Sequence, residues 1–180
     1  MWLKFTFIHI CIYLKRRQNM LIKEVDRNPI DLSNRVRGFE PVNEDAYYKL
    51  PTRSDKRSAG YDFYSTETFT IQPNEFHTFK TNIKAYMKDD EYLAIHVRSS
   101  IGIKKNLILK NVTGVIDSSY YDNPSNGGDI SIGLFNYGKE PQTIEKGDRV
   151  AQGIFAKYLT VDDDVVLNKT RSGGIGSSGI

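Results

Sequence analysis

Polar clusters that could do chemistry follow apolar stretches of this 180-residue chain. Arg98, Ser99 and Ser100 follow the stretch 92–97, and an arginine beside two hydroxyls can hold phosphate oxygens through charge-assisted hydrogen bonds. Asp117 ends the stretch 114–116, where a carboxylate can orient a water molecule and accept its proton. Gln152 ends a third cluster and can donate an amide hydrogen bond to phosphate. Each pattern taken alone is also typical of a solvated or aspartate-capped turn.

A Gly- and Ser-rich stretch closes the chain at residues 168–180. Its glycines allow the backbone to wrap closely around a ligand, and Arg171 can grip a phosphate with two hydrogen bonds. The same composition is typical of a flexible linker. His77 and His96 have no second ligand at metal-binding spacing, and the acidic run 162–164 is interpreted as a solvated loop.

The elements that must position these clusters are short β-strands. From Ala59 onward apolar residues recur with a period of two, and Gly, Asn, Asp or Pro separates many of the stretches. This pattern predicts an all-β sandwich, barrel or jelly roll, with one short helical turn at 101–106. Gly38 and Pro41 make the stretch 35–42 an edge strand at best. The other expected strands are 61–65, 69–71, 75–80, 83–87, 92–97, 107–110, 114–116, 129–136, 142–144 and 150–157.

Length and composition indicate one domain with a substantial core. The net charge of +3, from 25 basic and 22 acidic residues, is too weak and too mixed to indicate a nucleic-acid binder. A single Cys excludes an intrachain disulfide framework and a Cys-rich zinc site. The content of aromatic and aliphatic residues excludes global disorder.

The first nineteen residues differ in character from the rest. Residues 2–14 are mostly apolar, but they are too few to span a hydrocarbon core of roughly 30 Å as a helix. The basic cluster follows the apolar run, whereas a signal peptide carries it in front. We interpret the segment as an overlong start that precedes a true start at Met20, with a membrane-associating tail or an extra strand as alternatives. The chain thus divides into a doubtful leader 1–19, a β domain 20–167 and a flexible arm 168–180.

Taken together and in order, five clusters resemble the five motifs of the trimeric deoxyuridine triphosphatases (dUTPases). Each is weak alone, but five in the right order at plausible spacing are not expected by chance. In the second motif, Ser99-Ser100 resembles the pattern of the phage-type and Gram-positive branch of that family. The motifs occupy residues 59–63, 98–100, 111–120, 147–152 and 171–179.

The resemblance implies a β jelly roll, a distorted barrel, that forms homotrimers with three active sites between subunits. It implies Mg²⁺-assisted hydrolysis of dUTP to dUMP and pyrophosphate, which keeps uracil out of DNA and supplies dUMP for thymidylate synthesis. The implied location is the cytoplasm, or the host cytoplasm if a phage encodes the protein. The implied partners are dUTP and the other two copies, with a regulatory protein as a further candidate and with no nucleic acid or membrane.

The resemblance also implies a role for each matching residue. Asp117 would activate the water that attacks the α-phosphorus, and Tyr120 would pack beneath the deoxyribose and leave no room for a 2′-hydroxyl. Asp62 would support Mg²⁺ indirectly, through bound water. The implied substrate contacts are Asn111, Gly114, Val115 and Ile116 for uracil, Ser99, Ser100 and Gln152 for the α- and β-phosphates, and Arg171, Gly176 and Ser177 for the γ-phosphate, with Arg98 supporting them at the subunit contact.

Two features depart from the family pattern. Ile175 stands where members usually have a phenylalanine that stacks on uracil, so an aliphatic side chain would cover the base. The loop 121–128 is several residues longer than usual and lies beside the expected base pocket. Tyr121 in this loop is a candidate for the missing aromatic lid, and an exposed loop with no such part is the alternative.

Two other functions remain open on the sequence. A dCTP deaminase shares the fold but needs a catalytic glutamate in the strand after the third motif, near which this chain has Gly133. A regulatory binding protein of phage type would use the long loop and the N-terminal extension, in addition to or in place of catalysis.

Overall fold

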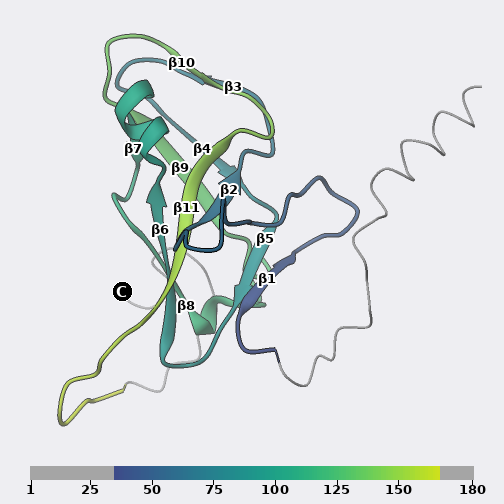
Figure 1. Cartoon of the computed structure of the whole chain (residues 1–180), viewed down its shortest axis with the longest axis vertical. Helices are drawn as coiled ribbons and strands as arrows, with labels where there is room; N and C mark the ends of the chain where they lie inside the picture. The colour runs from purple at the N-terminus through teal and green to yellow at the C-terminus, as the bar shows by residue number, and fades with distance from the viewer. Residues whose placement is uncertain (1–34, 167–180) are drawn as a thin grey trace, which may run out of the picture. The chain divides into compact units, whose positions relative to one another are not determined.

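The computed structural model describes residues 35–166, which form short strands and two helical turns (Figure 1). The predicted all-β architecture is confirmed. The leader 1–19 and the arm 168–180 lie outside the described residues, as does the segment 20–34. The strands are β1 (Gly38–Pro41), β2 (Tyr61–Tyr64), β3 (Phe69–Ile71), β4 (Phe76–Lys80), β5 (Ile83–Tyr86), β6 (Glu91–Val97), β7 (Leu107–Leu109), β8 (Gly114–Asp117), β9 (Ser131–Asn136), β10 (Gln142–Ile144) and β11 (Arg149–Lys157), and the helical turns are η2 (Ser100–Lys104) and η3 (Ser118–Tyr120).

The largest sheet has the antiparallel order β2-β11-β6-β8. Its second strand, β11, pairs with β2 on one side and with β6 on the other (Figure 1). Gly153 of β11 lies where an added Cβ would approach Phe63 Cε2 to 2.8 Å and Leu93 Cδ1 to 3.0 Å. A glycine there lets two fully buried side chains meet across the strand, which closes the core beneath this sheet.

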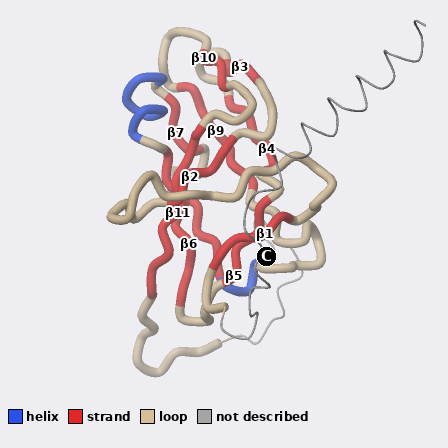
Figure 2. The backbone as a smooth tube through the Cα atoms, turned by 45° about the vertical axis from the view of Figure 1, so that its right-hand side comes forward, coloured by secondary structure: helices blue, strands red, loops and turns tan. Residues whose placement is uncertain are grey.

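The remaining strands complete a jelly-roll arrangement around a shared core. They form a three-stranded sheet β4-β9-β7 and the two-stranded pairs β1-β5 and β10-β3 (Figure 2). Among the described residues the sheets stay separate and do not close into a barrel. The core includes Phe63, Leu93, Leu107, Ile132 and Leu134, each at most 1% exposed. Residues 36–166 therefore share one close-packed core, which can support the surface loops.

Strand alternation places the candidate site residues of the large sheet on one face. Asp62 lies opposite Gln152, which lies opposite His96, and Tyr92 lies opposite Asp117. Side chains at opposed positions share a face, and so do alternate residues along one strand such as Tyr92 and His96. Asp62, Gln152 and Asp117 are therefore on the same face, turned away from the core.

The first strand is anchored, close to its start, by an ion pair between the exposed Arg37 and the buried Glu91. Arg37 donates from Nε and Nη2 to the two carboxylate oxygens of Glu91, at 3.0 and 2.6 Å. This bond from Arg37 lowers the pKa of Glu91, whose side chain is 4% exposed.

Among residues 35–166, no helix is long and apolar enough to cross a membrane.

Candidate active site

A pocket of about 230 Å³ opens beside β8. Its walls come from β6, β7, β8, β9 and the turns that follow β7 and β8. The four residues expected to contact uracil and the tyrosine expected beneath the deoxyribose all line it. The residues that line it are Ile95, Leu109, Asn111, Gly114, Val115, Ile116, Tyr120, Ser131, Ile132 and Gly133. Pockets for drug-sized ligands are typically about 300–1,000 Å³, so this one suits a base with its sugar, and a triphosphate would extend outside it.

The backbone of β8 supplies the hydrogen-bonding edge of this pocket. Among residues 35–166, β8 pairs with β6 alone and lies at the edge of its sheet, where backbone N–H and C=O groups can bond to a ligand. Asn111, at the turn before β8, adds an exposed amide that can donate and accept. The mixture of donors and acceptors can read the edge of a pyrimidine base.

Tyr120 forms the aromatic wall of the pocket. Its side chain is 8% exposed, and its hydroxyl donates to the carbonyl oxygen of Asp129 at 3.1 Å. The same hydroxyl accepts a hydrogen bond from Asn126 Nδ2 at 2.7 Å. The ring is thereby fixed at its far end as well as at its backbone.

Asp117 lies at the end of β8 and is not among the residues that line the pocket. It lines a shallow cleft of about 440 Å³ together with Tyr92, Val115, Lys157 and Tyr158. Lys157 and Tyr158 were not singled out from the sequence, because they stand at the far end of β11 and only strand pairing brings them beside β8. A carboxylate on an exposed face beside such a pocket can act on a water that reaches it from solvent.

Asp62 is a buried carboxylate that joins two arginines. Its Oδ1 lies 2.9 Å from Arg98 Nε, and its Oδ2 accepts from Arg149 Nη1 at 3.2 Å. Asp148, the chain neighbour of Arg149, accepts instead from the backbone N–H of Glu145 at 3.0 Å. Asp62 therefore links the first, second and fourth motifs, in front of Gln152 on the same sheet face.

Ser99 and Ser100 begin the helical turn η2 directly after Arg98. Ser99 is exposed and Ser100 is half-buried. The N–H groups of Ile101 and Gly102 both donate to the carbonyl oxygen of Arg98 at 2.9 Å, so these two amides already have partners. The two serine hydroxyls and the half-buried Arg98 therefore remain the main candidates for a phosphate contact in this turn.

One chain does not bring all of the predicted site residues together. Tyr92 pairs with Asp117 at one end of β6, whereas Ser99 and Ser100 follow Val97 at the other end. With a strand rise of roughly 3.3 Å per residue, Tyr92 and Val97 lie roughly 17 Å apart. The two helical turns, blue in Figure 2, accordingly lie at opposite ends of the domain.

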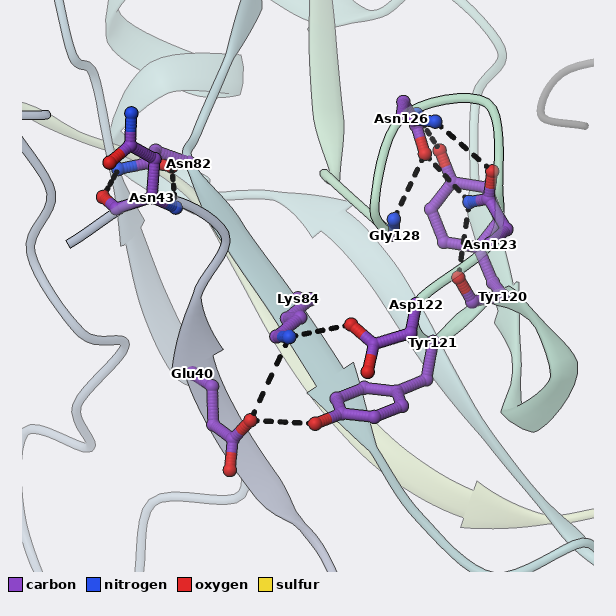
Figure 3. A network of polar contacts seen from close by, with 10 residues as sticks. All are labelled: Glu40, Asn43, Asn82, Lys84, Tyr120, Tyr121, Asp122, Asn123, Asn126 and Gly128. Carbon is purple, nitrogen blue, oxygen red and sulfur yellow. Dashed lines mark hydrogen bonds and ion pairs between the residues drawn. The ribbon is translucent and has the colours of Figure 1, made fainter.

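Tyr121, the candidate aromatic lid over the base, contacts Glu40 of β1 and Tyr86 of β5. Tyr121 does not line the pocket, and its hydroxyl donates to Glu40 Oε2 at 2.7 Å on the side of the loop that faces β1 (Figure 3). Its ring also meets Tyr86 of β5 edge-on, with centroids 6.2 Å apart. The other proposed cover, Ile175, lies outside the described residues together with Arg171, Gly176 and Ser177.

Comparison with known proteins identifies the family. Residues 46–179 match the dUTPase family. The chain is 43% identical over 148 residues to the deoxyuridine 5′-triphosphate nucleotidohydrolase of Lactococcus lactis, covering 81% of this chain and 99% of that protein. It is 34% identical over 139 residues to the enzyme of the same name from Haemophilus influenzae, covering 73% of this chain and 88% of that protein.

Solved structures agree with the sequence matches. The crystal structure of dUTPase from Streptococcus mutans is similar with a TM-score of 0.64 and 38% identity, over 69% of this chain and 98% of that one. The dUTPase from phage phi11 of Staphylococcus aureus has the same fold, with a TM-score of 0.61 and 22% identity over 75% of this chain and 98% of that one. With the pocket of the third motif, the Asp62 ion pairs and these matches together, the chain belongs to the dUTPase family.

Proposed function

We propose that this chain hydrolyses dUTP to dUMP and pyrophosphate. The observation that carries the proposal is the pocket beside β8, in which Asn111, the β8 backbone and Tyr120 enclose a space for a pyrimidine base and its sugar. Asp117 follows that backbone directly, at the point where the phosphates of a bound nucleotide would leave the pocket. The reaction would take place in the cytoplasm, or in the cytoplasm of a host cell, because nucleotides are held there.

The reaction we propose is an in-line displacement at the α-phosphorus. Asp117 would accept a proton from the attacking water, which forms one P–O bond as the bond to pyrophosphate breaks. Ser99, Ser100 and Gln152 would hold the α- and β-phosphates, and Arg171, Gly176 and Ser177 of the arm would close on the γ-phosphate. Positioning and neutralisation of charge would supply most of the rate enhancement.

The active site would be assembled from different copies of the chain. The distance along β6 keeps the Asp117 and the Ser99 of one chain apart, yet both would have to reach one triphosphate. A homotrimer in which the β8 end of one copy meets the η2 end of the next resolves the conflict, since a head-to-tail interface closes into a ring.

Magnesium fits as a metal bound chiefly through the substrate. Among residues 35–166 no three His, Cys, Asp or Glu side chains gather to hold a metal, and Mg²⁺ commonly keeps several waters and uses substrate phosphates as ligands. Both oxygens of Asp62 already contact arginines, and their remaining lone pairs could accept hydrogen bonds from water bound to Mg²⁺. When bound, Mg²⁺ would neutralise the triphosphate charge.

Deamination of dCTP is not supported by the pocket. A deaminase needs a carboxylate beside the base to move protons, and none of the residues that line the pocket is acidic. Gly133 of β9 occupies the wall where that group would be required.

Turnover of a nucleotide panel tests the proposed function. The full-length protein with Mg²⁺ is expected to release pyrophosphate from dUTP and to leave dTTP, dCTP and UTP nearly untouched. The small pocket would have no room for a 5-methyl group or a 2′-hydroxyl, and the hydrogen-bonding groups of Asn111 and the β8 backbone would distinguish a 4-oxo group from a 4-amino group. Ion-exchange chromatography of the products would measure this. Equal turnover of the four nucleotides, or release of uracil nucleotides from dCTP, would contradict the proposal.

Hybrid trimers test assembly of the site from two copies. Asp117→Asn and Ser99→Glu, the second of which repels phosphate from an exposed position, should each be nearly inactive alone. Co-expressed in equal amounts, they should regain about a quarter of wild-type turnover, because about one site in four then draws both intact residues from different copies. A double variant in one chain, mixed with itself, is the matched control. No recovery in well-mixed hybrids would place the whole site within one chain.

A further inference from the structure

The loop between η3 and β9 holds the hydroxyl of Tyr120 from outside the pocket. Asn126 Nδ2 donates to Tyr120 Oη at 2.7 Å and to the carbonyl oxygen of Asp129 at 3.3 Å. The Tyr120 hydroxyl donates to that same carbonyl oxygen at 3.1 Å. These three groups form a closed triangle of hydrogen bonds at the tip of the pocket's aromatic wall. Figure 3 shows Asn126 beside Tyr120 within this loop.

The orientation of the Asn126 amide is fixed by the rest of the loop. Its Oδ1 accepts from Asn123 Nδ2 at 2.6 Å and from the backbone N–H of Gly128 at 3.0 Å. Because both partners are donors, the oxygen must face them and the Nδ2 must face Tyr120. The loop therefore presents a donor, and not an acceptor, to the tyrosine.

The loop itself is rigid enough to act as a support. Asn123 is 3% exposed, and its Oδ1 accepts from the hydroxyl of Ser125 at 2.7 Å and from two backbone N–H groups. Gly128 has a φ of +81°, and an added Cβ would lie 2.8 Å from the carbonyl oxygen of Tyr120. A loop closed by buried amides and a left-handed glycine is expected to keep one shape.

The opposite side of the same loop is tied to different strands. Lys84 Nζ lies 2.5 Å from Asp122 Oδ1, and Tyr121 donates to Glu40. Burial and the bond to Glu40 raise the pKa of Tyr121, so its hydroxyl stays protonated and donates at neutral pH. Two neighbouring tyrosines are thus anchored on opposite sides of the loop, and only Tyr120 lines the pocket.

We propose that Asn126 is a positioning residue that sets the discrimination between deoxyribose and ribose by fixing the Tyr120 ring. This rests on the proposed function for the identity of the nucleotide. Tyr120 is the one aromatic ring among the residues that line the pocket, and the pocket of about 230 Å³ has little spare room. A ring that is held at its hydroxyl cannot swing aside to admit a 2′-hydroxyl.

The experiment compares deoxyribonucleotides with ribonucleotides in Asn126→Ala. In the full-length protein, the ratio of dUMP to UMP affinity by calorimetry and the ratio of dUTP to UTP kcat/KM should both fall roughly five- to tenfold, the scale of one lost hydrogen bond. The change should arise from better acceptance of the ribonucleotide, with kcat for dUTP nearly unchanged. Thermal melting of each variant would show that the domain stays folded.

Two further variants separate positioning from loop stability. Tyr120→Phe removes the Asn126–Tyr120 hydrogen bond from the other partner, together with the bond from Tyr120 to Asp129, and leaves the Asn126 contacts to Asn123 and Gly128 intact. It should therefore lower the ratio at least as much as Asn126→Ala. The double variant should lower the ratio no further than Tyr120→Phe alone, because the Asn126–Tyr120 hydrogen bond is already absent there. Tyr121→Phe is the matched control, since it removes a hydroxyl bond from the same loop without touching the pocket, and its ratio should match the wild type.

The outcomes are distinct. An unchanged ratio in Asn126→Ala, additive effects in the double variant, or an equal loss in Tyr121→Phe would each overturn the role of Asn126. A wild-type protein that binds dUMP well above UMP yet does not hydrolyse dUTP would contradict the proposed function alone, and the binding ratios would still decide the role of Asn126. A wild type with no preference for dUMP would overturn both.

Discussion

Asp117→Asn is expected to lower dUTP turnover roughly 10²–10⁴-fold, the usual contribution of a positioned general base. Asparagine keeps the size and the hydrogen-bonding reach of the side chain but cannot accept a proton from water. The fold should be unaffected, because Asp117 is exposed at the end of β8. Binding of a non-hydrolysable dUTP analogue should remain close to normal, since the pocket is lined by other residues.

Steady-state kinetics and calorimetry on the same preparation would measure both quantities. Asp122→Asn is the matched control, because it makes the same chemical change five residues later in an exposed aspartate that pairs with Lys84. Its turnover should stay within about twofold of the wild type, as is usual for surface substitutions. Near-normal turnover in Asp117→Asn would remove this residue from the role of base.

Asp62→Asn is expected to reduce the free energy of unfolding by roughly 3 kcal/mol, the scale for breaking a buried ion pair by removing one partner. The carboxylate is 5% exposed and accepts from both Arg98 and Arg149. An asparagine in its place can accept from one arginine but turns its own N–H₂ group toward the other, so one guanidinium loses its partner. Urea denaturation at neutral pH would measure the loss.

The control for Asp62 is the exposed pair of Asp90 with Lys157, whose side chains are 51% and 67% exposed. Asp90→Asn should change the free energy of unfolding by about 1 kcal/mol or less, since exposed ion pairs contribute little. If Asp62→Asn kept full stability while the dependence of turnover on Mg²⁺ changed, the residue would serve the metal and not the ion-pair network.

Most of the strands could be predicted because alternation and turn residues are local signals. The expected strand 69–71 is β3 and the expected strand 142–144 is β10, with the same bounds. The edge strand expected at 35–42 is observed as β1, paired only with β5. The short turn expected at 101–106 is observed as η2, one turn of π-helix that begins at Ser100.

Interactions between distant residues could not be predicted in the same way. The choice of Asp62 over Asp148 as the partner of Arg149 depends on the pairing of β2 with β11, which no local pattern encodes. Two successive tyrosines look alike in sequence, whereas in the structure Tyr120 lines the pocket and Tyr121 contacts Glu40. Asn126 gave a weak signal as part of an Asn-Gly turn, but its contact to Tyr120 required the folded loop.

The position of β11 within the large sheet also determines when the chain can fold. In the sheet, β2 at residues 61–64 and β6 at residues 91–97 are joined only through β11, at residues 149–157, which lies between them. The pairings of β3 with β10 and of β4 with β9 are likewise separated by long stretches of sequence. Such non-local pairing must overcome loop-closure entropy first, which places folding in the range of about milliseconds to seconds. During synthesis the ribosome must therefore release nearly the whole domain before the sheet that carries Asp62, Gln152 and Asp117 can form.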